Sequence, residues 1–362
     1  MKRLLLVGAG HAQLAVLAAM ARRRFAAAES MLVTPHPRTL YSGMVPGLVA
    51  GRFGAAECTI DIAALARAAG VHLRLGEMVA LDAAARRVTL ADGQVLDYEL
   101  LSLDTGAVQA RERIPGAREH ALFVRPIEAF ATLWARAREL GLARPLAVAV
   151  IGGGAAGVEL ALAVRRALPT ANVTLLADPP AVPAGYAPRV QRLAQAALRR
   201  AGVQVLPGQC TAIEAKHVCI GTMRVASDVA VLATGAEAPA WLAPSGLALD
   251  ERGFVRTGPT LQSASHPAVF AAGDVSSRDD VPHPKSGVYA VRAGPVLAEN
   301  LRAAAAGGTL ARYAPQRRSL NLLALGDGRA IASWGGWSLQ GRLMGWWKDR
   351  IDRGFVARFR SP

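Results

Sequence analysis

The chain has 362 residues, of which 52% are hydrophobic, so it can bury a sizeable core in two or three domains and is no disordered tail. Its 42 lysines and arginines outnumber 27 acidic residues, and the net charge of +15 suits nucleic acid, an anionic membrane surface, acidic partners or phosphate-bearing cofactors. Many arginines stand together at the ends of predicted helices, where they complement the helix dipole, and no nucleic-acid-binding motif accompanies them. We therefore expect no nucleic-acid partner.

The three cysteines, Cys58, Cys210 and Cys219, form neither a CxxC pair nor a metal-ligand cluster, so we expect reduced thiols in a cytoplasmic protein and no metal. The apolar run at residues 4–20 superficially reads as a signal peptide. Glycines interrupt it at the spacing of a strand, a turn and a helix, and we expect no export.

The first predicted elements are an apolar strand at residues 4–7, a glycine turn and a helix. In dinucleotide-binding folds such glycines let the backbone turn and approach the pyrophosphate, and the helix N-terminus supplies N–H groups for it. Gln13 replaces the third glycine of the pattern and loosens it. The next strand ends in Thr34, where such folds usually place an acid for the adenosine ribose. The turn reads Gly8-Ala9-Gly10-His11-Ala12-Gln13.

Residues 35–47, which include Tyr41, are rich in turn formers and too irregular for a regular element. This segment either lines a ligand or is an ordinary surface loop. Beyond it we expect a helix at 62–69 and then strands at 71–75, 79–81 and 87–90. A further strand ends in Thr105-Gly106.

A second glycine turn, complete this time, organises the middle of the chain. It follows an apolar strand at residues 146–151, reads Gly152-Gly153-Gly154-Ala155-Ala156-Gly157, and opens a helix to about residue 168. Three glycines between a strand and a helix predict a dinucleotide site. Glu159 projects from the first helical turn near the nicotinamide end, or it only complements the helix dipole.

Asp178 stands just past the next strand, at the spacing of a ribose ligand. Ala177 occupies the more usual acid position, so the choice between the two nicotinamide cofactors stays open. Strands around Cys210 and Cys219 precede an apolar strand that ends in Thr234-Gly235. The order of glycine turn, antiparallel strands and strand with Thr-Gly therefore occurs twice, which two nucleotide domains of one design explain.

Two more signals follow in the last third of the chain. An apolar strand delivers Gly273-Asp274 at its C-terminal end, where a carboxylate can hold a polyol or ribityl hydroxyl. Lys285, Gly287 and Val288 then begin a helix that aims N–H groups and a cation at an electron-rich ligand.

Residues 341–362 predict an amphipathic basic helix. It either lies in an anionic membrane interface close to a quinone pool, or folds back as a lid whose tryptophans pack on the flavin domain. The apolar stripe consists of Met344, Trp347, Ile351, Phe355 and Phe359, and the cations largely off it are Lys348, Arg350, Arg353 and Arg358.

Jointly, these segments resemble the pyridine nucleotide-disulfide oxidoreductase superfamily of flavoproteins with two dinucleotide-binding domains. Within it the chain looks most like the type II NADH dehydrogenase and sulfide:quinone oxidoreductase branch, and closest to NADH dehydrogenase-like proteins found alone or fused to selenophosphate synthetase. The residues that carry the resemblance lie at 8–12, 41–44, 152–160, 265–274 and 348–353. No CxxxxC follows the first turn, which excludes a redox disulfide, and His283-Pro284 stands where sulfide:quinone oxidoreductases keep a cysteine.

The resemblance implies an α/β fold with two Rossmann-like domains. Residues 1–114 and 241–325 would form an FAD domain, 115–240 an inserted NAD(P)H domain and 326–362 a C-terminal interface segment. Glu159 and Lys285 would be the catalytic residues. FAD would be held by Gly8, Gly10, His11, Ala12, Gln13, Thr34, Tyr41, Val79, Thr105, Gly106, Gly273, Asp274, Lys285, Gly287 and Val288. NAD(P)H would be held by Gly152, Gly154, Ala155, Gly157, Asp178, Thr234 and Gly235.

We therefore expect an FAD-dependent NAD(P)H oxidoreductase that passes hydride from NAD(P)H to FAD and then electrons to an acceptor, in the first place a quinone. The alternative is an FAD-carrying accessory module for selenium or sulfur metabolism that works through a partner, for which selenophosphate synthetase is the candidate. We expect the protein in the cytoplasm. Contact with the inner face of the membrane and formation of a homodimer are both left open.

Overall fold

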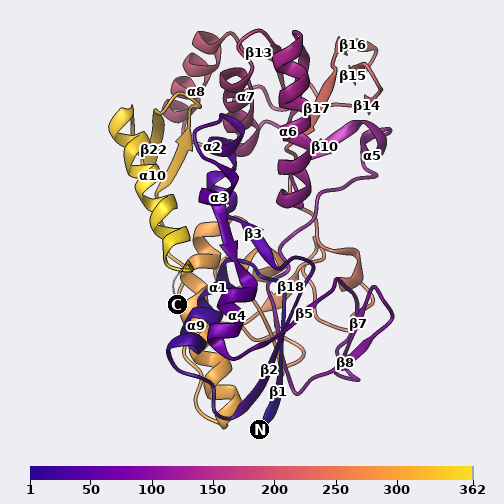
Figure 1. Cartoon of the computed structure of the whole chain (residues 1–362), viewed down its shortest axis with the longest axis vertical. Helices are drawn as coiled ribbons and strands as arrows, with labels where there is room; N and C mark the ends of the chain where they lie inside the picture. Colours follow the sequence, from indigo (N-terminus) through magenta and orange to yellow (C-terminus); the bar gives the residue numbers. More distant parts are fainter. Residues whose placement is uncertain (361–362) are drawn as a thin grey trace.

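The computed structural model describes residues 1–360, and Figure 1 shows two α/β units, one above the other. The lower unit is built on a parallel sheet in the order β19-β9-β1-β2-β5. Because β19 comes from far along the chain, this unit is discontinuous. Its strands are β1 (Lys2–Val7), β2 (Ala28–Thr34), β5 (His72–Leu75), β9 (Leu100–Leu103) and β19 (Val269–Ala271).

Alternation along β1 and β2 divides the lower core into two layers. Leu4, Leu6 and Leu32 face the helices, whereas Leu5 and Val7 face an antiparallel meander. The helices are α1 (His11–Arg22), α4 (Ile62–Ala69) and α9 (Gly287–Ala306), and the meander is β6 (Met78–Asp82), β7 (Arg87–Leu90) and β8 (Val95–Asp97).

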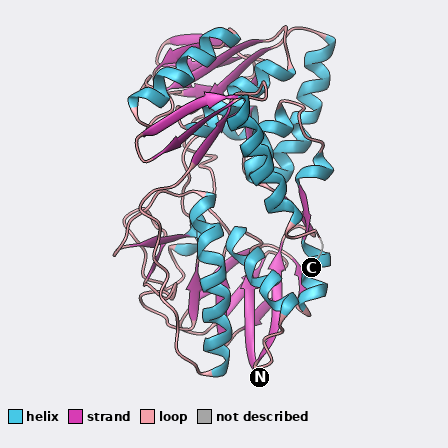
Figure 2. Cartoon of the chain, turned by 90° about the vertical axis from the view of Figure 1, so that its left-hand side faces the viewer, coloured by secondary structure: helices cyan, strands magenta, loops and turns pink. Residues whose placement is uncertain are grey.

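The upper unit repeats this design, with a parallel sheet in the order β10-β17-β11-β12-β13. Val148 and Val150 face helices, and Ala149 and Ile151 face a second meander. In Figure 2 helices lie against strands in both units. The strands are β10 (Ala121–Phe123), β11 (Ala147–Ile151), β12 (Asn172–Ala177), β13 (Gln204–Pro207) and β17 (Val229–Leu232). The helices are α6 (Ile127–Ala143), α7 (Ala155–Ala167) and α8 (Pro188–Ala201), and the meander is β14 (Ala212–Ile213), β15 (His217–Ile220) and β16 (Met223–Ala226). The predicted fold class of two Rossmann-like units, one of them inserted, is confirmed.

A C-terminal unit bridges the two. Strands β21 (Asn321–Ala324), β22 (Ala330–Trp334) and β23 (Trp337–Gly341) form an antiparallel sheet whose Leu323 and Ile331 pack into the upper core. Helix α10 (Arg342–Ala357) then descends along the side of both units in Figure 1 and buries Phe355 in the lower core. The antiparallel sheet of this unit begins with β21 at Asn321.

Smaller elements connect these units. The structure differs from the sequence-based predictions in two places. Residues 35–47 are more regular than expected, because β3 pairs with β4 and is followed by short helices. Cys210 lies between strands rather than in one. The connecting elements are β3 (Arg38–Leu40), η1 (Ser42–Met44), α2 (Val45–Val49), α3 (Ala55–Cys58), β4 (Thr59–Asp61), α5 (Ala117–His120), η2 (Ala240–Leu242), β18 (Val255–Thr257), η3 (Gly273–Val275) and β20 (Ser276–Arg278).

Candidate functional site

Both glycine turns lie at the C-terminal edges of the parallel sheets, where the first long helix of each unit begins. α1 begins after Gly10 and α7 after Gly154. Gly8 and Gly152 have φ values of +90° and +136°, a region that residues with side chains rarely adopt. A Cβ at either position would also collide with the strand end that leads into Thr105 or Thr234. The structure therefore brings each turn against its Thr-Gly segment.

Open space next to three glycines leaves room for ligands at these edges. A Cβ added at Gly106, Gly154 or Gly235 would meet no heavy atom within 4 Å. A dinucleotide can therefore lie directly against the backbone there, within reach of the N–H groups of a helix N-terminus. The residues present fit one dinucleotide in each unit.

The first turn contains a buried carboxyl group, Asp104, that the sequence analysis did not single out. It fits beside Gly10 and Gly273, where a Cβ would lie 2.3 and 2.5 Å from its oxygens. Its Oδ2 accepts a hydrogen bond from Gln13 N at 2.8 Å. Burial raises the pKa of Asp104 to about 7, although the Gln13 and Ala12 amides oppose the shift. One sequence signal could have identified Asp104: it stands directly before Thr105-Gly106, where the second unit has an apolar residue before its Thr-Gly pair.

The Gln13 side chain is a packing element rather than a cofactor ligand. Its Nε2 donates to Ser102 O at 3.2 Å, and its Oε1 accepts from the Ser102 hydroxyl at 2.8 Å. In the second turn a glycine takes this place, because a Cβ at Gly157 would lie 1.8 Å from Gly152 O. The two turns therefore close the gap between helix and strand in different ways.

The two units also differ at the predicted adenosine ends. Thr34 ends β2 and is buried, and Val79 lies on β6 with 46% of its surface exposed. Asp178 follows β12 directly and is exposed, whereas Ala177 is buried at the end of the strand. At the predicted adenosine end, the upper unit thus offers the exposed carboxylate of Asp178, whereas the lower unit offers only the hydroxyl of Thr34.

Asp274 follows β19 in the short helix η3, at the same sheet edge as Gly106. Its carboxylate Oδ2 accepts a hydrogen bond from Arg125 Nη2 at 3.0 Å. Arg125 comes from the upper unit, just after β10. No sequence motif contains both residues, so this pair could not be predicted from the sequence.

Lys285 and the N-terminus of α9 lie beside this edge. The Lys285 ammonium lies 3.6 Å from the centre of the Phe254 ring and donates to Ser276 O. Burial lowers the pKa of Lys285 to about 8, although Asp250 and Asp274 oppose the shift. α9 begins at Gly287, with Val288 in its first turn, and a Cβ at Gly287 would lie 3.0 Å from the His11 ring. The N-termini of α1 and α9 therefore meet at one place.

Glu159 joins α7 to the C-terminal unit. Its Oε1 accepts a hydrogen bond from Ala324 N at 2.7 Å. Burial raises the pKa of Glu159, and the nearby Lys348 ammonium opposes the shift. Lys348 donates to Gly43 O and to Asp352 Oδ2, both at 2.9 Å. Burial opposes the charged form of Lys348, but Glu159 and Asp352 together raise its pKa. Sequence analysis placed Lys348 on the polar side of a helix and missed this cluster.

An aromatic cluster continues from Lys348 to the first turn. Tyr41 stacks on Phe355 with ring centres 4.3 Å apart, and both rings meet His11 edge to face. Burial and then the Asp352 carboxylate raise the pKa of Tyr41. Tyr41 is thus packed against α10 and α1 rather than standing free in a loop, and its contact with a ligand stays a prediction. The cluster links α10 to the N-termini of α1 and α9.

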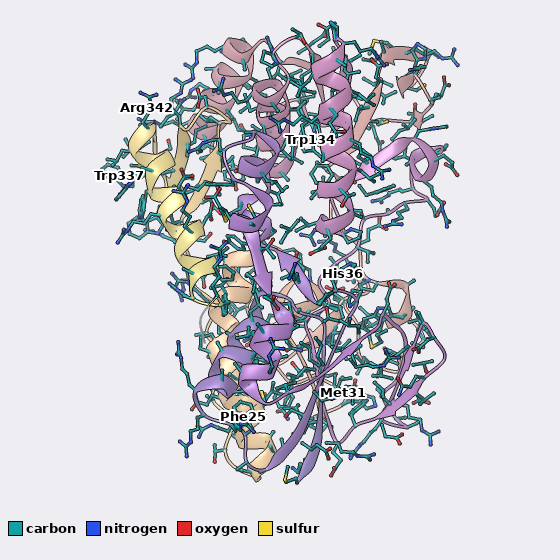
Figure 3. The ribbon with its side chains drawn as sticks, viewed as in Figure 1. Phe25, Met31, His36, Trp134, Trp337 and Arg342 are labelled. Atoms are coloured by element: carbon teal, nitrogen blue, oxygen red, sulfur yellow. The ribbon has the colours of Figure 1, made fainter. Side chains whose placement is uncertain are left out.

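The predicted apolar stripe of α10 divides into two parts. Phe355 and Phe359 are buried on the lower unit, but Trp347 and Ile351 are 39% and 42% exposed. Ser361 and Pro362 lie outside the described residues. Figure 3 shows Trp337 and Arg342 on the outer side of the C-terminal unit. Exposed apolar residues gather on this unit, and we call them the tryptophan patch: Trp334, Trp337, Leu339, Leu343, Trp346, Trp347 and Ile351.

Comparisons with known proteins agree with this architecture. The family described as "Pyridine nucleotide-disulphide oxidoreductase" matches residues 2–294. The chain is 26% identical to "Ferroptosis suppressor protein 1" of Taeniopygia guttata over 289 residues, which cover 76% of the chain and 74% of that protein. It is 32% identical to the ferredoxin–NAD(+) reductase component of the anthranilate 1,2-dioxygenase system of Burkholderia cepacia over 291 residues, 75% of the chain and 67% of that protein.

Solved structures share the fold over the whole chain. The sulfide:quinone oxidoreductase of Aquifex aeolicus superposes with a TM-score of 0.83 at 16% identity, covering 99% of this chain and 92% of that one. NDH2 of Plasmodium falciparum, solved with NADH, superposes with a TM-score of 0.81 at 12% identity, covering 99% and 97%. The chain belongs to the pyridine nucleotide-disulphide oxidoreductase family and is an FAD-dependent NAD(P)H oxidoreductase.

Proposed function

We propose that this oxidoreductase passes electrons from NAD(P)H through FAD to a quinone, which binds beneath helix α10. The observation that carries the proposal is the cluster of Lys348, Asp352, Tyr41 and His11, which connects the C-terminal helix to the flavin edge. FAD, when bound, would supply the redox chemistry that links NAD(P)H to the second substrate. The chain supplies binding, orientation and charge for both steps.

Each unit holds one cofactor in this proposal. Asp274 would hold the ribityl hydroxyls of FAD, and Lys285 with the first turn of α9 would stabilise negative charge on the flavin ring. Glu159 lies at the nicotinamide end of the second turn. Because Glu159 also contacts Ala324 and faces Lys348, it lies between the nicotinamide edge and the acceptor edge.

The acceptor site would combine flat aromatic rings with one buried cation. Tyr41, which is only partly buried, would lie against a quinone ring with Phe355 stacked behind it, and Lys348 Nζ would stabilise the negative oxygen of a quinone as it is reduced. The Lys348 side chain is only 13% exposed, so its charge is weakly screened.

The tryptophan patch is proposed to contact an anionic membrane surface that contains the quinone. None of the helices within residues 1–360 is long and apolar enough to cross a membrane. Trp337 is 78% exposed and Trp346 59%, and Arg350 lies over the Trp346 ring. Exposed tryptophans beside arginines suit the interface between lipid headgroups and water.

Rapid mixing with NADH and then with a quinone tests the proposal. We expect fast loss of oxidised flavin absorbance with NADH, followed by reoxidation by quinone. Lys348→Gln should slow reoxidation by quinone about 10-fold or more, as expected when one buried charged donor is lost. Reoxidation by ferricyanide should stay near the wild-type rate. The matched control is Arg353→Gln. Arg353 lies on α10, as Lys348 does, but it forms a half-exposed ion pair with Glu57 of α3. Equal quinone rates in Lys348→Gln and the control would contradict the acceptor site.

Membrane contact is tested separately with liposomes of anionic lipid. Replacing Trp337 and Trp346 by serine should abolish binding without changing FAD content, since neither contacts the His11 cluster. A truncation at residue 339 is less clean, because it also removes Phe355 from that cluster. If the unchanged protein ignores such liposomes at low salt, the membrane contact is wrong.

A second candidate is an accessory redox module that delivers electrons to a partner protein. The Burkholderia cepacia relative, named as a ferredoxin reductase component, favours a protein acceptor, and the net charge of +15 suits an acidic one. A partner in selenium metabolism, with selenophosphate synthetase as the candidate, belongs to the same class and rests on the sequence resemblance alone. Slow reoxidation by every quinone, with fast reduction by NADH, would favour this candidate.

A further inference from the structure

Arg125 belongs to the upper unit, but its guanidinium binds the lower one. It follows β10 at the ligand edge of the upper sheet. Its Nη2 donates to Asp274 Oδ2 at 3.0 Å, and its Nη1 donates to Ala107 O at 3.3 Å. One side chain therefore joins the flavin edge, the linker after Thr105-Gly106 and the nicotinamide unit.

Hydrogen bonds hold the backbone of Arg125 as well as its side chain. Arg125 N donates to Gln109 Oε1 at 2.9 Å, and Gln109 Nε2 donates to Leu232 O at 2.8 Å. Leu232 ends β17, immediately before the Ala233-Thr234-Gly235 segment. Gln109 is buried, so both bonds are protected from water. The position of Arg125 is thus fixed relative to the strand end that would face the nicotinamide.

The positive charge of Arg125 acts electrostatically on His11 at the flavin edge. Burial lowers the pKa of His11 to about 4, Asp274 opposes this shift and Arg125 adds to it. His11 lies where the N-termini of α1 and α9 meet. The Asp274 side chain is 14% exposed and the Arg125 side chain 41%, so water screens the pair only in part.

We propose that Arg125 is a positioning residue that fixes the flavin-binding carboxylate of Asp274 relative to the nicotinamide unit and places a positive charge beside the reduced flavin. The inference rests on the proposed function in that Asp274 holds FAD. With both cofactors bound, hydride transfer would leave the nicotinamide positive and add two electrons to the flavin, so negative charge would develop on the flavin side of Arg125. A geometry set by Arg125 shortens this transfer, and its charge favours the product.

The test compares Arg125→Gln with Arg125→Lys and with a matched control. Arg118→Gln is the control, because Arg118 lies in the same region of the chain and forms an exposed pair with Glu112. For each purified protein we would measure the FAD dissociation constant, the midpoint potential of the flavin and the single-turnover rate of flavin reduction at saturating NADH. The long-wavelength absorbance of the complex between oxidised nicotinamide and reduced flavin reports how the two rings stack.

Arg125→Gln should slow flavin reduction about 10- to 100-fold, because a bridging charged donor is worth that much in a transition state. The long-wavelength absorbance should weaken. Loss of the charge should weaken binding of the reduced flavin about 10-fold more than binding of the oxidised flavin, which lowers the midpoint potential by about 30 mV. Arg125→Lys should recover the potential but only part of the rate, since a single ammonium cannot bridge both acceptors.

Two outcomes would overturn the inference. Rates and potentials equal to those of Arg118→Gln would show that Arg125 plays no part in the reaction. A lowered melting temperature with unchanged potential and absorbance would make it only a structural tie. If Arg125→Gln does not fold, Arg125→Lys carries the same test through its rate. If neither NADH nor NADPH reduces the flavin of the unchanged protein, the proposed function fails instead, whatever the variants do.

Discussion

The two glycine turns share one backbone plan but treat the helix N-terminus differently. In the second turn nothing would meet a Cβ at Gly154 within 4 Å, whereas in the first turn a Cβ at Gly10 would lie 2.3 Å from the Asp104 carboxyl. The start of α7 is therefore open beside Gly154, whereas at the start of α1 Asp104 already accepts a hydrogen bond from Gln13 N. The same motif therefore forms two different anion sites. At the second turn the anion affinity depends on the N-terminus of α7 alone, whereas at the first turn the Asp104 carboxyl group modifies the anion affinity.

The largest effect is expected at Gly157, because its packing leaves no space for a side chain. In Gly157→Ala the Cβ would lie 1.8 Å from Gly152 O, so α7 must move away from β11. Overpacking of this kind costs about 1–3 kcal/mol, and we expect NADH affinity to fall about 100-fold while FAD stays bound. Calorimetric titration with NADH measures this. Gly154→Ala is the control for stability, and wild-type NADH affinity in Gly157→Ala would contradict the reading of the second turn.

The next effect concerns Asp274 in the first unit. Removing a charge-assisted hydrogen bond typically costs about 1.5–3 kcal/mol, so Asp274→Ala should weaken FAD binding about 10- to 100-fold. It also leaves Arg125 without its carboxylate partner. Flavin content after dilution and gel filtration measures the loss. Full flavin occupancy at low concentration would rule out the ribityl assignment.

Much of this comparison could be predicted from the sequence. Strand, turn and helix follow one another within a few residues, so local periodicity located both turns, both Thr-Gly ends and Gly273-Asp274. The apolar spacing of α10 was also visible, but not that Phe355 would be buried and Trp347 exposed. That division depends on which part of the helix another unit covers.

What the sequence could not reveal are contacts between distant residues. Lys348 bonds Gly43, and Arg125 bonds Asp274, across 305 and 149 positions of the chain. No local pattern marks either pair, because each depends on how the two units and the C-terminal helix are packed together. Asp104 was missed for a related reason, since a polar residue at a strand end normally reads as exposed.

A smaller effect is expected at Glu159. Glu159→Gln keeps an oxygen that can accept from Ala324 N but removes the charge that faces Lys348. If Glu159 orients the nicotinamide, flavin reduction by NADH should slow about 10-fold with unchanged FAD content. Stopped-flow reduction measures the rate. A wild-type rate would leave Glu159 as a favourable charge at the start of a helix.

The smallest effect separates the two turns by pH. The pKa of Asp104 is raised to about 7, so its protonated form stabilises the fold at low pH, and this contribution is lost as the pH rises through about 7. Asp274 is the charged group that faces Asp104 and adds to the shift. A bound pyrophosphate adds negative charge near Asp104 and should raise its pKa further, so FAD binding takes up a proton near neutral pH.

FAD affinity should therefore fall as the pH rises from 6 to 9, by about 10-fold if the pyrophosphate raises the pKa by one unit. Asp104→Asn keeps the shape of the side chain and an oxygen for Gln13 N, but it cannot ionise, so its FAD affinity should vary less over this range than that of the unchanged protein, and the remaining change would come from Lys285, whose pKa is lowered to about 8. Fluorescence titration with FAD measures both proteins, and ADP-ribose binding at the second turn is the internal control because Gly154 faces open space. Equal pH profiles in Asp104→Asn and the unchanged protein would show that Asp104 does not distinguish the first turn from the second.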